Sequence, residues 1–167
     1  LYPLLAAMPR QGLDRLAFLT MKTPGRRLAL DALTDLGADR DAERLPLRVL
    51  ELMARDKACE HPDRACHGDA CPLAQGFYDR LPAARRDAVA RGFWDRASLR
   101  ELALEHGVCP YYLGQELARW ADVLVGDVNH YFDDGALIHG LAQTDGSRLG
   151  VLVDEAHNLV DRARGMY

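Results

Sequence analysis

Long apolar runs are missing from this chain of 167 residues. No stretch reaches the roughly 18 apolar residues of a membrane span, and no signal-peptide pattern opens the chain. A basic excess is missing too, since the formal net charge is −4 at pH 7. These absences argue against membrane-spanning and secreted proteins, and the charge gives no support for nucleic-acid binding, although local patches decide binding. We expect an intracellular protein. The start at Leu1 without Met indicates a piece of a longer one.

The composition fits one ordinary globular domain, with 49% hydrophobic and 28% charged residues. Short apolar runs predict strands at residues 14–20, 47–52, 123–126 and 149–154. Helical patterns separate them at residues 25–36, 74–79, 83–93, 98–106 and 110–121. In the fourth of these, Ser98 and Glu101 have the spacing of a capping box, which predicts Ser98 as N-cap. Alternating strands and helices predict an α/β fold with a parallel sheet.

Cysteine is scarce, but three of the four cysteines lie in a polar stretch that has no helical or strand periodicity. The complete set is Cys59, Cys66, Cys71 and Cys109, with the spacing C-x6-C-x4-C-x37-C. The close C-x2-C pair usual in structural zinc sites is missing. Wide, uneven spacing suits a [4Fe–4S] cluster, whose irons take thiolates from different directions. Spacing alone leaves zinc and iron–sulfur open, with His61 and His67 as alternative ligands; cysteines without metal are the third interpretation.

The segment "VLVDEAH" at residues 151–157 places two carboxylates directly after a predicted strand. In a nucleotide-hydrolysing site, one such carboxylate holds Mg²⁺ and the next orients or deprotonates the attacking water. Asp154 suits the first role and Glu155 the second, while His157 would report nucleotide state to neighbouring elements. The alternative is an acidic helix N-terminus, where Asp and Glu are favoured by the helix dipole.

The segment "FLTMKT" at residues 18–23 is a second polar strand end. Thr20, Lys22 and Thr23 have donors for phosphate oxygens, and such contacts position a nucleic-acid strand without reading its sequence. The alternative is a plain loop between a strand and a helix, with a solvated lysine.

Taken in order, these segments resemble the XPD/DinG family of superfamily 2 DNA helicases. "LTMKT" resembles motif Ia, which touches single-stranded DNA, and the four cysteines resemble the family's inserted iron–sulfur domain. "VCPYYLGQELARWADVLVGDVNHYFD" resembles the segment returning to the motor domain, and "VLVDEAHNL" resembles motif II, the Walker B or DEAH box. The resemblance spans nearly the whole chain.

The resemblance implies a partial RecA-like P-loop motor domain with an inserted α-helical [4Fe–4S] domain. Residues 1–56 and 118–167 would belong to the motor domain and residues 57–117 to the insert. It implies Cys59, Cys66, Cys71 and Cys109 as cluster ligands, Asp154 as magnesium ligand, Glu155 as catalytic base, His157 as coupling residue, and Thr20, Lys22 and Thr23 as DNA contacts.

The resemblance also implies a biological setting. The full-length protein would be a cytoplasmic, nucleoid-associated, ATP-dependent 5′–3′ helicase of DNA repair or replication. It would use ATP and Mg²⁺ and act on single-stranded DNA and duplex junctions.

Two parts of the family pattern are missing from the sequence. It contains no G-x-x-x-x-G-K-S/T phosphate loop and no second motor domain. We therefore expect a fragment that does not hydrolyse ATP alone, from a protein whose phosphate loop lies before Leu1. A non-enzymatic nucleic-acid-binding module, stabilised by zinc or by a cluster, is the alternative function.

Overall fold

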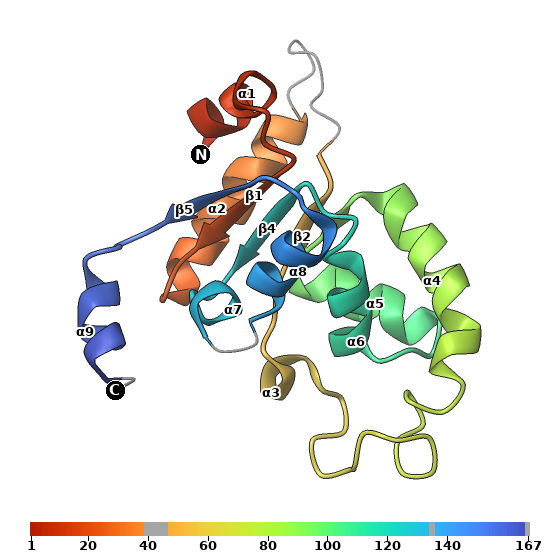
Figure 1. Cartoon of the computed structure of the whole chain (residues 1–167). Coiled ribbons are helices and arrows are strands. Elements are labelled where there is room, and N and C mark those ends of the chain that lie inside the picture. Colours follow the sequence, from red (N-terminus) through yellow and green to blue (C-terminus); the bar gives the residue numbers. More distant parts are fainter. Residues whose placement is uncertain (39–46, 134–135, 166–167) are drawn as a thin grey trace.

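The fold is built around a sheet of five parallel strands, ordered β3-β2-β4-β1-β5 (Figure 1). A computed structural model describes residues 1–38, 47–133 and 136–165. The predicted α/β fold with a parallel sheet is confirmed. The strands are β1 (Arg15–Leu19), β2 (Val49–Glu51), β3 (Phe93–Trp94), β4 (Val123–Gly126) and β5 (Leu149–Val153).

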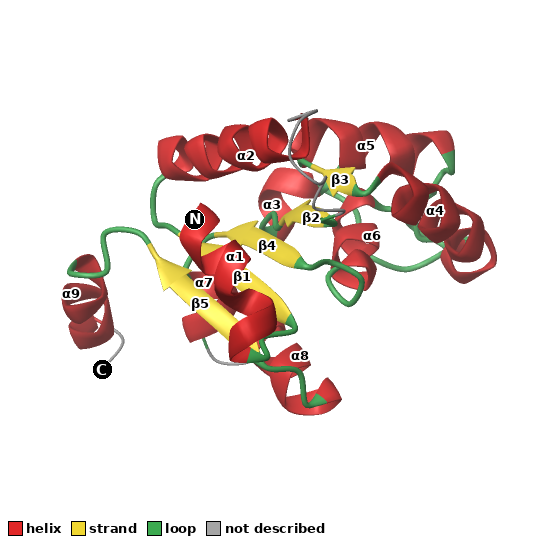
Figure 2. Ribbon diagram, turned by 90° about the horizontal axis from the view of Figure 1, so that it is seen from above, coloured by secondary structure: helices red, strands yellow, loops and turns green. Residues whose placement is uncertain are grey.

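Helices surround this sheet and extend beyond its β3 end. They are α1 (Tyr2–Gln11), α2 (Thr23–Ala38), α3 (Arg55–Ala58), α4 (Phe77–Arg91), α5 (Arg96–Glu105), α6 (Pro110–Leu117), α7 (Asn129–Phe132), α8 (Leu137–Asp145) and α9 (Asn158–Gly165). Figures 1 and 2 show α4, α5 and α6 beside the β2–β3 end of the sheet and α9 beyond the β5 end. None of the helices in the described ranges has both the length and the apolar character needed to cross a membrane.

Successive strand residues face opposite sides of the sheet, as the two-residue period of a strand requires. Leu16 of β1 and Val123 of β4 pack with α1 and α2 in one buried cluster. Their chain neighbours Ala17 and Leu124 pack on the other face, in a cluster that includes residues of α4, α5, α6 and α8. Both faces of the sheet are therefore covered, as parallel sheets require.

The register of the three central strands positions the polar residues that follow them. Leu19, the last residue of β1, lies opposite Gly126 of β4 on one side and Val153 of β5 on the other. Because parallel strands end at the same edge, Thr20 and Asp154 are neighbours although they are far apart in the sequence. The candidate site forms at this carboxyl edge, as expected for an open parallel sheet.

The helices predicted at residues 74–79 and 83–93 were wrong in number and extent. The structure has one helix, α4, and Gly92 ends it with a left-handed backbone at φ 72°. Phe93 and Trp94 then form β3, which pairs with β2. A strand of two residues carries too little sequence pattern to be predicted, and neighbouring tertiary contacts determine it.

The predicted cap of the helix at residues 98–106 was also wrong. Helix α5 begins at Arg96, and its N-cap is Asp95, whose carboxylate accepts a hydrogen bond from the Ser98 backbone N–H at 2.9 Å. The Ser98 hydroxyl donates to the same Asp95 oxygen at 2.6 Å. Asp95 is an equally good capping residue and lies in the extended conformation that an N-cap needs.

We expect Asp95→Ala to lower the free energy of unfolding by about 1 kcal/mol, because the first turn of α5 loses its cap. Urea denaturation followed by circular dichroism measures this change. Glu101→Ala is the matched control: Glu101 is exposed on the same helix, and a cap at Asp95 makes its removal nearly neutral. If Glu101→Ala lowered the free energy of unfolding more than Asp95→Ala, the result would favour the Ser98–Glu101 capping box over the Asp95 cap.

Candidate functional site

The carboxyl edge of the sheet brings Thr20, Gly25 and Asp154 together. The Asp154 backbone N–H donates to the Leu19 carbonyl at 2.8 Å, which fixes the position of Asp154 beside the end of β1. A Cβ atom at Gly25 would lie 2.8 Å from Thr20 Oγ1 and 3.0 Å from Asp154 Oδ2. The first turn of α2 therefore approaches both side chains closely, and glycine permits this approach.

The three residues predicted to contact nucleic acid lie between the end of β1 and the first residue of α2, and they differ in exposure. Thr20 is buried, with 1% of its surface exposed, and its hydroxyl accepts a hydrogen bond from the Lys22 backbone N–H at 3.2 Å. Lys22 and Thr23 are exposed. A direct phosphate contact by Thr20 would require this turn to open, so its DNA-binding role stays a prediction, as do those of Lys22 and Thr23.

Glu155 forms an ion pair with Lys22. Lys22 Nζ lies 2.8 Å from both Oε1 and Oε2 of Glu155, so one ammonium group bridges the carboxylate. This hydrogen bond and the charge of Lys22 lower the pKa of Glu155, and the charge of His157 lowers it further. Glu155 is therefore ionised near neutral pH, and the pairing with Lys22 makes it a weaker proton acceptor.

The backbone of Glu155 has φ 52°, in the left-handed region that non-glycine residues rarely adopt. It is the second residue after β5 and forms a turn in which the Asn158 backbone N–H donates to the Glu155 carbonyl at 3.0 Å. The Asn158 side chain donates to Glu155 Oε2 at 3.3 Å. His157, in the same turn, is exposed. The roles predicted for Asp154, Glu155 and His157 stay predictions.

Sequence reasoning missed three residues at this edge. Gly25 allows the close approach of α2, Asn158 supports the Glu155 carboxylate, and His130 lies against the end of β4. A Cβ atom at Gly126 would be 2.9 Å from the His130 ring, and burial lowers the pKa of this histidine. Asn158, three residues after Glu155, was a turn signal visible in the sequence. The contacts of Gly25 and His130 join segments that are distant in the sequence, so no local pattern predicts them.

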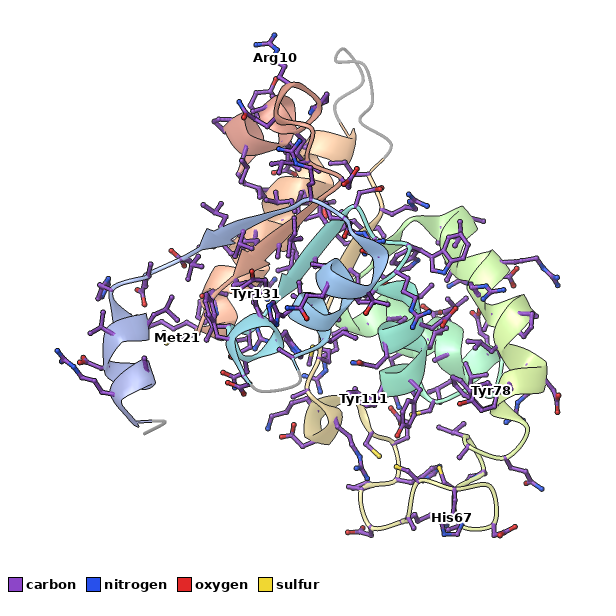
Figure 3. All side chains as sticks on the ribbon, viewed as in Figure 1. Arg10, Met21, His67, Tyr78, Tyr111 and Tyr131 are labelled. Carbon is purple, nitrogen blue, oxygen red and sulfur yellow. The ribbon has the colours of Figure 1, made fainter. Side chains whose placement is uncertain are left out.

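The four cysteines differ in burial. Cys71 and Cys109 are buried, Cys59 is intermediate and Cys66 is exposed, and all four are free thiols in the described chain. Cys59 directly follows α3, and Cys109 is the N-cap residue of α6. Residues 59–76 form turns without a helix or strand. Figure 3 shows sulfur atoms gathered where this loop meets the helices.

Two of the other thiols act on Cys109. Burial raises the pKa of the Cys109 thiol, and the charges of Cys59 and Cys71 raise it further, while backbone N–H groups of Tyr112 and Tyr111 lower it. Among the residues that the structure describes, however, no three His, Cys, Asp or Glu side chains have an arrangement that could hold a metal ion. Cys59, Cys66, Cys71 and Cys109 as cluster ligands therefore stay a prediction.

The histidines offered as alternative ligands lie in the same loop. Figure 3 places His67 at the outer tip of the loop, pointing away from the sulfur atoms. Next to His61, Glu60 accepts two hydrogen bonds from the Arg100 guanidinium, at 2.6 and 2.7 Å. This pair fixes the start of the loop to α5 and lowers the pKa of Glu60.

Comparison with known proteins identifies the group to which this chain belongs. A family model described as DEAD_2 matches residues 46–167, which is more than half of the chain. The chain belongs to the DEAD_2 family. The DEAD_2 match includes the four cysteines and the "DEAH" segment, while "LTMKT" lies before it.

Curated relatives of this DEAD_2 chain are named as helicases. It is 29% identical over 129 residues to a regulator of telomere elongation helicase 1 homolog of Anopheles gambiae, covering 68% of this chain and 12% of that protein. It is 26% identical over 125 residues to the Bos taurus regulator of telomere elongation helicase 1, covering 67% and 10%. With the Dictyostelium discoideum general transcription and DNA repair factor IIH helicase subunit XPD, it shares 24% over 83 residues, covering 50% and 11%.

The predicted resemblance to iron–sulfur superfamily 2 helicases is thereby confirmed. The DEAD_2 chain spans about a tenth of the length of these curated relatives.

Proposed function

We propose that this chain is part of the first motor domain of an ATP-dependent DNA helicase and carries the iron–sulfur insert of that domain. One observation supports the proposal above the others: the carboxyl edge of the sheet joins the DEAH turn to the loop after β1. Glu155 pairs there with Lys22, and Asp154 is hydrogen-bonded to the last residue of β1, so the groups proposed for ATP hydrolysis and for DNA contact share one edge.

In this proposal Asp154 holds the magnesium ion that accompanies ATP, and Glu155 acts on the attacking water. The water oxygen bonds to the γ-phosphorus while the bond from phosphorus to the ADP oxygen breaks, and Glu155 takes the water proton. Asp154 is held at the sheet edge by its backbone bond to Leu19, and Glu155 follows it in a left-handed turn. His157, exposed in the same turn, couples this step to movement of the adjoining elements.

Lys22 and Thr23 bind the phosphate backbone of single-stranded DNA. Both side chains are exposed at the start of α2, and the Lys22 ammonium is paired there with Glu155. Contacts of this kind carry no sequence information, which suits an enzyme that moves along DNA of any sequence. The direction of movement that we propose is 5′ to 3′, towards duplex junctions in DNA repair or replication.

The cysteine chemistry fits a [4Fe–4S] cluster. Four free thiols supply the all-cysteine ligand set of such clusters, and Cys59 and Cys71 both lie within electrostatic range of Cys109. A bound cluster would supply cross-links between the loop at residues 59–76 and helices α3 and α6. The loop lacks regular structure of its own, so we propose a structural role for the cluster. Residues 57–117 form the insert in this proposal.

ATP hydrolysis and strand separation in the complete protein test this function. We expect single-stranded DNA to stimulate ATP hydrolysis, duplexes with a 5′ tail to be unwound, and Asp154→Asn to abolish both activities. Asp161→Asn, which changes an exposed carboxylate on α9, is the matched control and should keep both. If the complete protein bound DNA but hydrolysed no ATP, the helicase proposal would be wrong and the non-enzymatic nucleic-acid-binding module would be favoured.

A further inference from the structure

Lys22 and Glu155 belong to turns that leave neighbouring strands. Lys22 follows β1 and Glu155 follows β5, and the single Lys22 ammonium lies 2.8 Å from both Glu155 oxygens. The proposed function assigns these two side chains to different ligands, DNA phosphate and the attacking water. Each side chain is instead occupied by the other.

We propose that the Lys22–Glu155 ion pair is a switch that makes ATP hydrolysis depend on DNA. Without DNA, the Lys22 ammonium occupies both oxygens of the Glu155 carboxylate, so neither oxygen is free to take a proton from the attacking water. A phosphate of single-stranded DNA then replaces the carboxylate as the partner of Lys22, and Glu155 becomes free to accept a proton. This inference rests on the proposed function and adds a regulatory contact to it.

The exposure of the pair makes this exchange feasible. The Lys22 side chain is 63% exposed and that of Glu155 36% exposed, so DNA can reach the ammonium without unfolding the site. Exposed ion pairs are weak, because water and salt screen them and two long side chains lose freedom. A DNA strand presents several neighbouring phosphates, and its binding releases condensed cations. A single carboxylate offers neither advantage, so DNA can displace Glu155 from Lys22.

The surrounding contacts confine the movement to side chains. Thr20 is buried, and Met21 is partly buried against the main core cluster, so the backbone on the N-terminal side of Lys22 is fixed. Figure 3 shows Met21 between the end of β1 and α9. Only the flexible Lys22 side chain needs to turn from Glu155 towards the DNA.

The turn at Glu155 is poised to respond when Lys22 leaves. Among the described residues, Glu155 is the one non-glycine residue whose backbone is left-handed. Such strain persists where surrounding contacts impose it. Lys22 and Asn158 both restrain its carboxylate. Removing Lys22 leaves the weaker Asn158 contact, so the carboxylate gains freedom to turn towards water.

A double-mutant cycle on binding of fluorescein-labelled oligo(dT) to this chain tests the exchange. We expect Glu155→Gln to tighten binding about two- to fivefold, because Lys22 no longer has a competing carboxylate. Lys22→Met should weaken binding and reduce the salt slope by about 0.7. In the Lys22→Met background, Glu155→Gln should have no effect.

Two control variants separate the ion pair from general charge effects. Asp161→Asn removes another exposed carboxylate of the same terminal region, and Arg27→Met removes another exposed cation of α2. Neither should alter the size of the Glu155→Gln effect. Circular dichroism melting curves confirm that each variant is folded.

The outcomes distinguish this inference from the function on which it rests. Equal tightening by Glu155→Gln with and without Lys22 would overturn the exchange while leaving DNA binding intact. Absence of oligo(dT) binding in every variant would overturn both. In the complete protein, Lys22→Met should raise ATP hydrolysis measured without DNA and reduce its stimulation by DNA; a fall in DNA-free hydrolysis would overturn the switch.

Discussion

Cys109→Ser is expected to remove the iron and the visible absorption of anaerobically purified protein while leaving the central sheet folded. Cys109 is buried at the start of α6, and in the proposed cluster it joins this helix to Cys59 and Cys71. Loss of one ligand frees the loop at residues 59–76, which has no helix or strand to hold it. Strands β4 and β5 pack outside that loop and should keep their hydrogen bonds.

Iron analysis, visible absorption and hydrogen exchange measure these effects together. We expect amide protection to be lost in residues 59–76 and kept in β4 and β5. His67→Ala is the control, because His67 was the alternative ligand and its ring points away from the sulfur atoms in Figure 3. A Cys109→Ser protein that retains its full iron content would show that Cys109 is not a ligand. A colourless wild-type protein that contains zinc would favour the zinc site.

Trp94→Ala should cause the largest loss of stability among single substitutions in the core, about 3–5 kcal/mol. Trp94 is 1% exposed, and it is one of the largest fully buried side chains. It packs in the cluster shared by α4, α5 and α6, and its Nε1 donates to the Ala88 carbonyl of α4 at 2.7 Å. Truncation would leave a cavity where α4 meets the sheet and would remove one of two hydrogen bonds to the Ala88 carbonyl, which keeps its bond from the Gly92 backbone N–H at 3.0 Å.

Urea denaturation followed by circular dichroism measures this loss. Trp94→Phe separates its two causes, because phenylalanine keeps most of the ring volume and loses the hydrogen bond to Ala88. That variant should lose about 0.5–1.5 kcal/mol, because the Ala88 carbonyl stays paired with the Gly92 backbone N–H. Tyr78→Ala is the exposed aromatic control, since Tyr78 is 82% exposed. A loss below about 1 kcal/mol in Trp94→Ala would contradict the packing of α4 on the sheet end.

The sequence was sufficient for the elements with strong local patterns. All four predicted strands match β1, β2, β4 and β5 closely, because runs of Leu, Val and Ala bounded by polar residues favour a buried strand. Their alternation with helices also predicted the parallel sheet. The family resemblance followed from the order of "LTMKT", the cysteines and "VLVDEAH", and the DEAD_2 match confirmed it.

Elements whose ends depend on distant partners were predicted poorly. The pattern at Ser98 and Glu101 satisfied the local rule for a cap, yet Asp95 lies at the true helix start. Two nearby residues competed for the same backbone donors, and the pairing of Phe93 and Trp94 with β2 determined where the chain leaves the sheet.

The sequence by itself determined which chemical groups this protein has: four thiols, two carboxylates after a strand, and a lysine after another. The tertiary structure decided which of them meet. Lys22 and Glu155 are separated by 133 positions, and only the pairing of β1 with β5 brings their side chains within 2.8 Å. The local sequence pattern predicts only which residues of each strand are buried. The order of strands in the sheet depends on packing across the whole chain, and that order determines which strand ends become neighbours.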